Sequence, residues 1–299
     1  MREYLIEFTE RLGFSEKARG ELLFAYGAVL SAPSAERILL KALADYEKAT
    51  PTAWHWSRTE RALDGIADLI SVPSETLKLL FCILLTPTLR RRYRESGYED
   101  PLFDDAVLDL RWKALECERM RGFTGVFCFD FLHPLFALER FTLGRLQFRL
   151  ETADRTISTE SIHLAPGDAY LNMRIPSSGP LERALLADSY GRAIEFFRER
   201  LKRKPTVIQC TSWLLFPRHR ELLSPDSNIR RFAEDFELYD SGESREGEDL
   251  WRIFYKNAKN PPDQLPRSTT LERVYADLLM RGEFPGWGSG VLLAERFKA

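Results

Sequence analysis

Residues 169–181, AYLNMRIPSSGPL, predict a strand, a turn and the start of a helix in direct succession. Polar and apolar residues alternate from Tyr170 to Ile175, which is the two-residue period of a half-buried β-strand. The turn that follows is rich in proline and serine, and Pro180 suits the first turn of a helix, where its missing N–H has no partner to lose. An amphipathic helical pattern then continues to about residue 201.

Two further strands are predicted on either side of this segment. Residues 145–150, RLQFRL, alternate strictly. Residues 206–215 are rich in apolar and β-branched residues, as is typical of a more central strand. Alternation returns at residues 251–255, and a glycine-rich turn at 286–290 precedes a last strand at 291–293. The C-terminal half is therefore predicted to contain a mixed sheet with helices.

Residues that typically begin or end helices recur along the N-terminal part of the chain, which predicts several successive helices. Gly13 suits a left-handed helix end, and Ser15 suits the start of the next helix. Ser57 and Glu60 have the spacing of a capping box, in which each side chain binds a free backbone N–H, so we expect a helix to begin there.

The most apolar window, Leu77–Leu85, lies between two prolines and predicts a buried core helix. The helical period gives way to the strand period between Gly122 and Leu143. The expected fold is therefore α+β, with a helical N-terminal domain at residues 1–122 and a mixed α/β C-terminal domain at residues 123–299.

Composition and charge narrow the classes of partner. The 43 basic and 45 acidic side chains give a net charge of −2, so we expect no nucleic acid partner. The four cysteines lie far apart and none has metal-ligand spacing, so we expect no metal and reduced thiols. No apolar window reaches the ~20 residues of a membrane span, and the N-terminus has no signal-peptide pattern, so we expect a cytoplasmic protein. The oligomeric state stays open.

Five segments resemble a bacterial acyltransferase family that joins a helical N-terminal domain to a GNAT-like C-terminal domain. They are LGRLQF (143–148), LNMRIPSSGPL (171–181), CTSWLL (210–215), PDSNIRRF (225–232) and LPRSTTL (265–271). The resemblance implies a GNAT-like fold for residues 123–299 and transfer of an acyl group from a coenzyme A thioester to an amine. It also implies acyl-CoA or acetyl-CoA as co-substrate and a small-molecule amine as acceptor.

The resemblance places coenzyme A along the second strand and the loop after it. Enzymes of this class carry Gln/Arg-x-x-Gly-x-Gly/Ala there, and Arg174 and Gly179 fit that pattern, whereas Ser177 replaces the first glycine. Alternatively, the loop is an ordinary strand-to-helix turn with a serine or glycine cap. The expected cofactor-binding residues are Asn172, Met173, Arg174, Ser177, Ser178 and Gly179.

Three residues are candidates for catalysis. Ser212, on the third strand, could hold the amine or a water molecule. Asn228 could reach the cleft, although the segment around it is also typical of a helix cap. Tyr239 is a candidate for the acid that protonates the leaving thiolate, as a tyrosine does in some GNAT enzymes. Each of these side chains also has a structural interpretation.

Other chemically active side chains have plainer interpretations. Cys210 is a candidate acyl acceptor but is more typical of a small buried hydrophobe. Tyr190 is a second candidate acid, and His219 is expected in a surface segment. The basic run at residues 90–94 is either a solvated helix face or a contact for the 3′-phosphate of coenzyme A.

An alternative function follows from Ser177 and from the lack of an evident base. The chain would then be a catalytically inactive GNAT-like module that binds a ligand or a partner. An opening between the second and third strands, lined by Arg174 and Ser212, would favour the enzyme.

Overall fold

A computed structural model describes residues 1–201 and 207–293. The chain divides into two compact units, Met1–Thr142 and Leu143–Ala299. The domain boundary predicted after residue 122 coincides with the end of a helix, where Gly122 is the C-cap with a φ of 85°. The structure places residues 123–142 with the helical unit.

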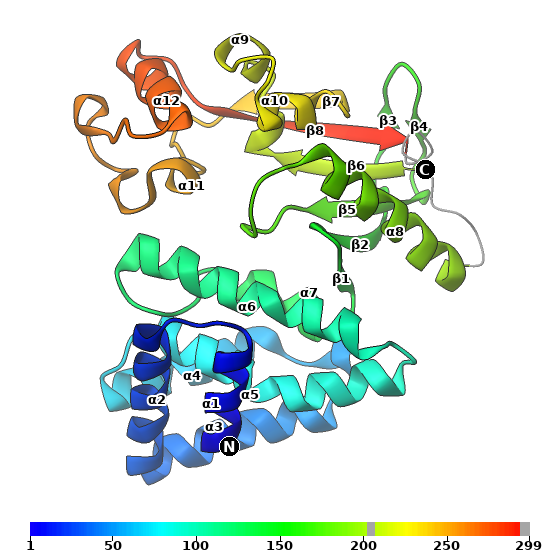
Figure 1. The fold of residues 1–299 in the computed structure, drawn as a ribbon. Helices are drawn as coiled ribbons and strands as arrows, with labels where there is room; N and C mark the ends of the chain where they lie inside the picture. The colour runs from blue at the N-terminus through cyan, green and yellow to red at the C-terminus, as the bar shows by residue number, and fades with distance from the viewer. Residues whose placement is uncertain (202–206, 294–299) are drawn as a thin grey trace. The chain divides into compact units, whose positions relative to one another are not determined.

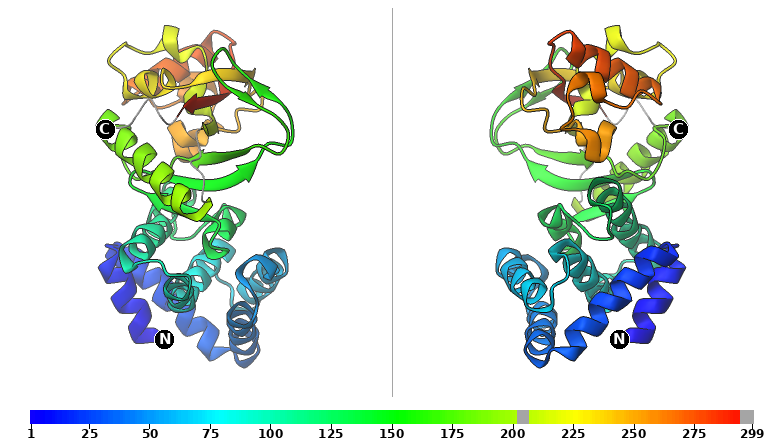
Figure 2. Two further views of the ribbon diagram at one scale, coloured as in Figure 1. Left: turned by 90° about the vertical axis from the view of Figure 1, so that its right-hand side faces the viewer. Right: turned by 90° about the vertical axis from the view of Figure 1, so that its left-hand side faces the viewer.

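The first unit is built of helices up to residue 136 (Figures 1 and 2). These are α1 (Arg2–Arg11), α2 (Glu16–Ser31), α3 (Pro33–Lys48), η1 (Pro51–Ala53), α4 (Trp56–Ile70), α5 (Ser74–Glu95), α6 (Asp100–Arg121), η2 (Phe129–Leu132) and α7 (His133–Phe136).

The predicted ends of the first helices are confirmed, whereas one predicted cap is wrong. Gly13 follows α1 with a φ of 70°, and the Ser15 hydroxyl accepts a hydrogen bond from the N–H of Ala18 at the start of α2. Helix α4 begins at Trp56 with His55 as its N-cap, so Ser57 and Glu60 form no capping box. The Glu60 carboxylate instead accepts a hydrogen bond from Lys78 on α5, at 2.8 Å.

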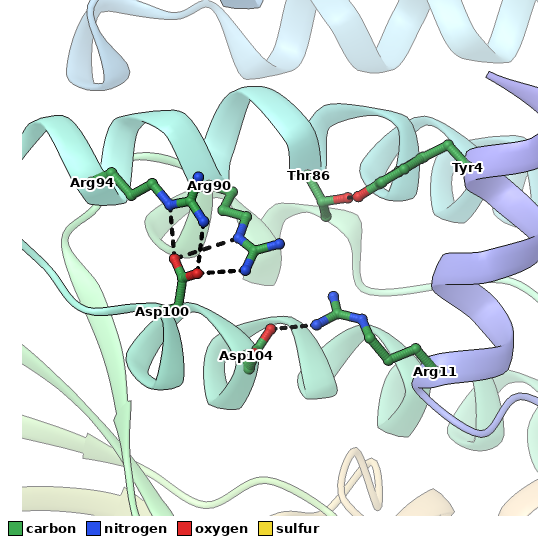
Figure 3. Close-up of polar contacts among 7 residues, drawn as sticks. All are labelled: Tyr4, Arg11, Thr86, Arg90, Arg94, Asp100 and Asp104. Atoms are coloured by element: carbon green, nitrogen blue, oxygen red, sulfur yellow. Dashed lines mark hydrogen bonds and ion pairs between the residues drawn. The ribbon is translucent and has the colours of Figure 1, made fainter.

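Helix α5 forms the core of this unit, as its apolar window predicts. It packs against α1, α2, α3, α4 and α6, and its residues 79–86 are all buried. The helix continues through Pro87 to Glu95. Pro87 has no N–H for the Ile83 carbonyl one turn earlier, and the Thr86 hydroxyl donates to that carbonyl at 2.6 Å instead. The Tyr4 hydroxyl lies 2.6 Å from the same Thr86 oxygen and donates to it (Figure 3).

Replacing Thr86 by valine is expected to lower the free energy of unfolding by about 1–3 kcal/mol. The substitution leaves the buried Ile83 carbonyl without a donor, and a lost partner of a buried acceptor costs about that much. Thr88→Val is the matched control, because the structure gives the Thr88 hydroxyl no such role, and it should cost less. Urea unfolding of the two variants compares the costs, and equal costs would contradict the proposed replacement of the missing helix hydrogen bond.

The basic run at the end of α5 binds acidic residues of its own unit. Arg90 and Arg94 both form ion pairs with Asp100, at 2.5 and 2.7 Å (Figure 3). Their hydrogen bonds, those of Arg94 first, hold the pKa of Asp100 well below its usual range. Arg91 lies 3.1 Å from Glu47, and Arg92 is buried beside Tyr46. These contacts explain the run without a coenzyme A phosphate.

The second unit holds most of a six-stranded sheet in the order β1-β2-β5-β6-β8-β7, as Figure 1 shows. Strand β1 (Arg140–Leu143) spans the boundary between the units. The other elements are β2 (Leu146–Thr152), β3 (Ile157–Ser158), β4 (His163–Leu164), β5 (Ala169–Arg174), α8 (Arg183–Leu201), β6 (Val207–Ser212), η3 (Trp213–Leu215), α9 (His219–Leu222), α10 (Asn228–Ala233), β7 (Glu237–Glu243), α11 (Trp251–Phe254), η4 (Tyr255–Asn257), η5 (Pro262–Gln264), α12 (Thr270–Met280) and β8 (Gly286–Leu293).

The α+β fold class and the three predicted strands around the central loop are confirmed, with changes at their ends. Strand β6 ends at Ser212 because its hydroxyl caps the short helix η3, and the predicted first residue, Thr206, lies outside the described residues. Helix α8 begins at Arg183 rather than Pro180. The predicted strand at 251–255 is wrong, since this segment is helical.

The two faces of the sheet have different coverings. Helix α8 packs on β2 and covers the face that carries the fully buried Leu171, Met173 and Ile208. On the other face, the β3–β4 hairpin forms an apolar cluster with Val207 and Val291. Beyond this cluster, the second face also carries the buried polar side chains of Gln209 and Ser289.

The glycines predicted as a turn lie inside β8 instead. A Cβ at Gly286 would overlap the ring of Phe216, and one at Gly290 would lie 2.9 Å from the Cβ of Phe236. At Gly288 it would overlap the carbonyl oxygen of Leu215. Gly286 and Gly288 thus let η3 and Phe216 pack directly on the sheet, and Gly290 makes room for Phe236.

Candidate active site

Strands β5 and β6 part at their carboxyl ends. They are parallel neighbours in register at Leu171–Ile208 and at Asn172–Gln209. Beyond these pairs, among the residues that the structure describes, β5 continues in register only with β2 and β6 only with β8. Backbone groups of the two strand ends are therefore not paired with each other, and an extended ligand can bind such groups by strand-like hydrogen bonds.

The loop that leaves this end of β5 is held by Arg145. Its guanidinium donates hydrogen bonds to the carbonyls of Pro176, Gly179 and Pro180, at 2.8, 2.6 and 3.2 Å. Burial lowers the pKa of Arg145, but it stays within the range of a permanently charged side chain. These three hydrogen bonds hold the loop in place on its carbonyl side.

Arg145 is itself held by a tight turn. The preceding residue, Gly144, has a φ of 71°, and a Cβ there would lie 2.7 Å from the Ser189 hydroxyl. That hydroxyl accepts the N–H of Arg145 at 2.7 Å. Ser189 belongs to α8, so the turn, the loop and the helix are tied together.

The six expected cofactor-binding residues lie along β5 and this loop. Met173 is fully buried and faces α8, whereas Arg174 and Ser177 are exposed and Ser178 is half-buried. Gly179 has a φ of 132°, which favours glycine, and nothing lies within 4 Å of its missing side chain. The Asn172 side chain does not face the loop, since its amide nitrogen donates to Gln209 at 3.1 Å.

The three catalytic candidates lie in different elements. The Ser212 hydroxyl accepts the N–H of Leu214 at 3.1 Å and so caps η3. Asn228 is exposed at the first residue of α10, next to the N-cap Ser227. Tyr239 lies at an irregularity in β7, where the register shifts, and its hydroxyl accepts a hydrogen bond from the buried Gln209 at 3.0 Å.

Cys210 and Tyr190 are both buried on the α8 face. Burial raises the pKa of the Cys210 thiol to about 12, and the nearby Arg174 only partly opposes this. Burial also raises the pKa of Tyr190 well above its usual value. Cys210 is therefore a protonated, apolar core residue, as its plainer interpretation predicts.

The sequence predicts no role in this site for two of its residues, Arg145 and Gln209. Gln209 could have been noticed, because it is polar within the apolar run of β6. Arg145 looks like the exposed residue of an alternating strand. Its role depends on a loop 31 to 35 residues later in the chain, which no local pattern reveals.

The expectation that His219 lies at the surface is wrong. Its exposed fraction is 0%. Its Nε2 lies 2.7 Å from the Tyr275 hydroxyl and its Nδ1 lies 3.2 Å from the Leu214 carbonyl oxygen, so it joins η3 to α12. Burial lowers its pKa to about 4.

The free energy of unfolding is therefore expected to fall by about 2 kcal/mol between pH 7 and pH 5 because of His219 alone. The unfolded histidine titrates near pH 6.5 and the folded one near 4, so the unfolded chain binds the extra proton in this range. Urea unfolding at the two pH values measures the loss. His219→Gln should remove that part of it, and the exposed His163→Gln should not. An unchanged loss in His219→Gln would contradict the assignment.

The described residues form neither a metal site nor a membrane-spanning helix. Among residues 1–201 and 207–293, no group of three His, Cys, Asp or Glu side chains could hold a metal ion. None of the described helices has the length and apolar character needed to cross a bilayer.

A mixed sheet whose adjacent parallel strands part next to a strand–loop–helix segment is the architecture of a GNAT-like protein. Family comparison agrees: residues 140–292 match the GNAT-like C-terminal domain, and residues 3–130 match the N-acyltransferase N-terminal domain. The chain belongs to this family, as the sequence resemblance implies.

Solved structures of similar fold are acyltransferases. One is an acyltransferase mutant in complex with octanoyl-CoA, with 23% identity, a TM-score of 0.75, and coverage of 97% of this chain and 88% of the other. Another is an acyltransferase with decanoyl-CoA and teicoplanin, with 23% identity, a TM-score of 0.74, and coverage of 96% and 87%. A third, with decanoyl-CoA, has 21% identity, a TM-score of 0.76, and coverage of 96% and 86%. No curated protein matches the chain.

Proposed function

We propose that this protein is an acyl-CoA-dependent N-acyltransferase that transfers an acyl group from a coenzyme A thioester to the amine of a small molecule. The observation that carries the proposal is the parting of β5 and β6 beyond Asn172–Gln209. An enzyme of this chemistry needs a groove with free backbone groups for the pantetheine arm, and the parted strands offer one. Family membership and the acyl-CoA ligands of the similar structures support it.

In the proposed complex, the pantetheine arm lies along β5 beyond Asn172, and a backbone N–H of that strand polarises the thioester carbonyl. The pyrophosphate lies over residues 174–179, within reach of the exposed Arg174 and of the Ser177 and Ser178 hydroxyls. The serine in place of the first glycine is accommodated because the loop is held from its carbonyl side by Arg145. Its opposite side is left to face the phosphates.

The transfer forms a C–N bond and breaks the C–S bond of the thioester. The amine loses one proton, and the thiolate of coenzyme A gains one. We assign the donor to Tyr239, whose hydroxyl accepts from Gln209 and keeps its own proton for a further partner. Ser212 and Asn228 are proposed to contact the acceptor, at the end of β6 and at the start of α10.

The ligands of the similar structures support a choice of acyl chains and acceptors to test. Those structures hold octanoyl-CoA, decanoyl-CoA or teicoplanin, so octanoyl-CoA, decanoyl-CoA and teicoplanin are the first substrates to test. We further propose a cytoplasmic location, since each of the four cysteines is a thiol rather than half of a disulfide and three of them are buried, which suits a reducing compartment.

The test is mass spectrometry of acceptor panels incubated with acetyl-, octanoyl- and decanoyl-CoA. The proposal predicts an acceptor whose mass increases by one acyl group and an equal amount of free coenzyme A. Tight acyl-CoA binding without transfer to any acceptor would instead favour the catalytically inactive module.

A further inference from the structure

Gln209 is a buried amide in the middle of the sheet. Its exposed fraction is 5%, and two of its neighbours on the same face, Val207 and the paired Val291, are apolar, whereas the paired Asn172 is polar. An apolar residue would fit this position without needing hydrogen bonds, because β6 lies between two partner strands. The reason for an amide here must therefore lie in the polar side chains that it binds.

Three side chains from three strands satisfy this amide. Its oxygen accepts from Asn172 on β5 at 3.1 Å, and its nitrogen donates to Thr211 on β6 at 2.9 Å and to Tyr239 on β7 at 3.0 Å. Thr211 in turn lies 2.6 Å from the Ser289 hydroxyl on β8. The network thus crosses the sheet from β5 to the edge strand β7.

The direction of these hydrogen bonds fixes the direction of the Tyr239 proton. An amide nitrogen has two protons, and both are donated here, one to Thr211 and one to Tyr239. The Tyr239 oxygen therefore acts as an acceptor toward the network. Its own proton must go to a partner outside the network, as a proton donor in transfer chemistry requires.

Gln209 also lies at the point where the pairing of β5 with β6 ends. Asn172 and Gln209 are the last residues at which β5 and β6 are in register, and their side chains are hydrogen-bonded as well. The irregularity in β7 at Tyr239 turns that side chain from the regular alternation of its strand, as such bulges do. One amide therefore holds both the end of the strand pairing and the hydroxyl beyond it.

We propose that Gln209 is a positioning residue of the acyl transfer. It holds the Tyr239 hydroxyl as a hydrogen-bond donor, and it fixes the point at which β5 and β6 part. The inference rests on the proposed acyltransferase function.

The test replaces Gln209 by glutamate, which has the same shape but a carboxylate that accepts the Tyr239 proton. At pH 8 we expect kcat to fall about tenfold or more, with little change in the KM for acyl-CoA. At pH 5 a protonated glutamic acid donates to Tyr239 as the amide does, so the ratio of wild-type to variant kcat should shrink. The exposed Gln264→Glu is the matched control and should retain the wild-type kcat at both pH values.

Each outcome of this test has a separate meaning. If the wild-type protein transfers no acyl group, the proposed function fails. If it does, then an unchanged kcat in Gln209→Glu, or a loss that is the same at both pH values, overturns the positioning role. If Gln209→Glu does not fold, Tyr239→Phe decides: a kcat about tenfold lower at unchanged KM supports the role, and an unchanged kcat overturns it.

Discussion

Replacing Gly288 by alanine is expected to lower the free energy of unfolding by about 3 kcal/mol, near the upper end of the usual cost of overpacking. The added Cβ would overlap the carbonyl oxygen of Leu215 and lie 3.0 Å from its carbonyl carbon. These are backbone atoms of η3, which cannot turn aside as a flexible side chain does. Relief requires η3 to move away from β8, and Ser212, which caps η3 and pairs with Gly288, must move with it.

A second glycine gives the control with the opposite sign. Gly191 lies within α8, and nothing lies within 4 Å of its missing side chain. Gly191→Ala should raise the free energy of unfolding by about 0.5–1 kcal/mol, because alanine favours a helix. Urea unfolding compares the two variants. Equal stability of Gly288→Ala and the wild type would mean that η3 does not pack on β8 as described.

Replacing Arg145 by methionine is expected to weaken acyl-CoA binding by about ten- to a hundredfold. Methionine keeps the unbranched shape but removes all three hydrogen bonds to the loop carbonyls. Hydrogen bonds to charged groups are worth about 1.5–3 kcal/mol each, and about 1.4 kcal/mol is a factor of ten in affinity, so the expected loss corresponds to about one of the three bonds. The loop must then be ordered at the expense of the binding energy, so the loss appears in the Kd.

Calorimetric titration with decanoyl-CoA measures this loss, and Arg192→Met is the control. Arg192 lies on α8, and its contact in the structure is the neighbouring Asp188 at 2.8 Å, one turn earlier in the same helix. Its replacement should leave the Kd within about twofold of the wild-type value, as expected for an exposed pair. An unchanged Kd in Arg145→Met would mean that the loop has no part in binding acyl-CoA.

The fold was predictable where the pattern is long and local. The alternation at 145–150 and 169–175 predicts β2 and β5, because each strand has one face against α8 and one against less apolar surroundings. The same reasoning fails at 251–255, where Ile253 and Phe254 are buried in a small helical cluster that only tertiary packing defines.

The candidate site was predictable only as a segment. A resemblance over residues 171–181 points to β5 and the loop after it, where the proposed function places acyl-CoA, but not to the contacts that hold them. Arg145 contacts the loop from a separate turn, and Gln209 joins three strands that are distant in sequence. The composition of residues 286–290 predicts a turn. The glycines there instead allow neighbouring segments, such as η3 at Gly288, to approach β8 closely.

Hydrogen–deuterium exchange of the whole chain, with and without saturating decanoyl-CoA, tests the central claim most directly. If acyl-CoA enters between β5 and β6, amides of the loop 175–182 and of the strand end at 210–215 should exchange more slowly when it is bound. Protection confined to residues 1–142, or no protection at a concentration at which calorimetry shows binding, would contradict this location of the site.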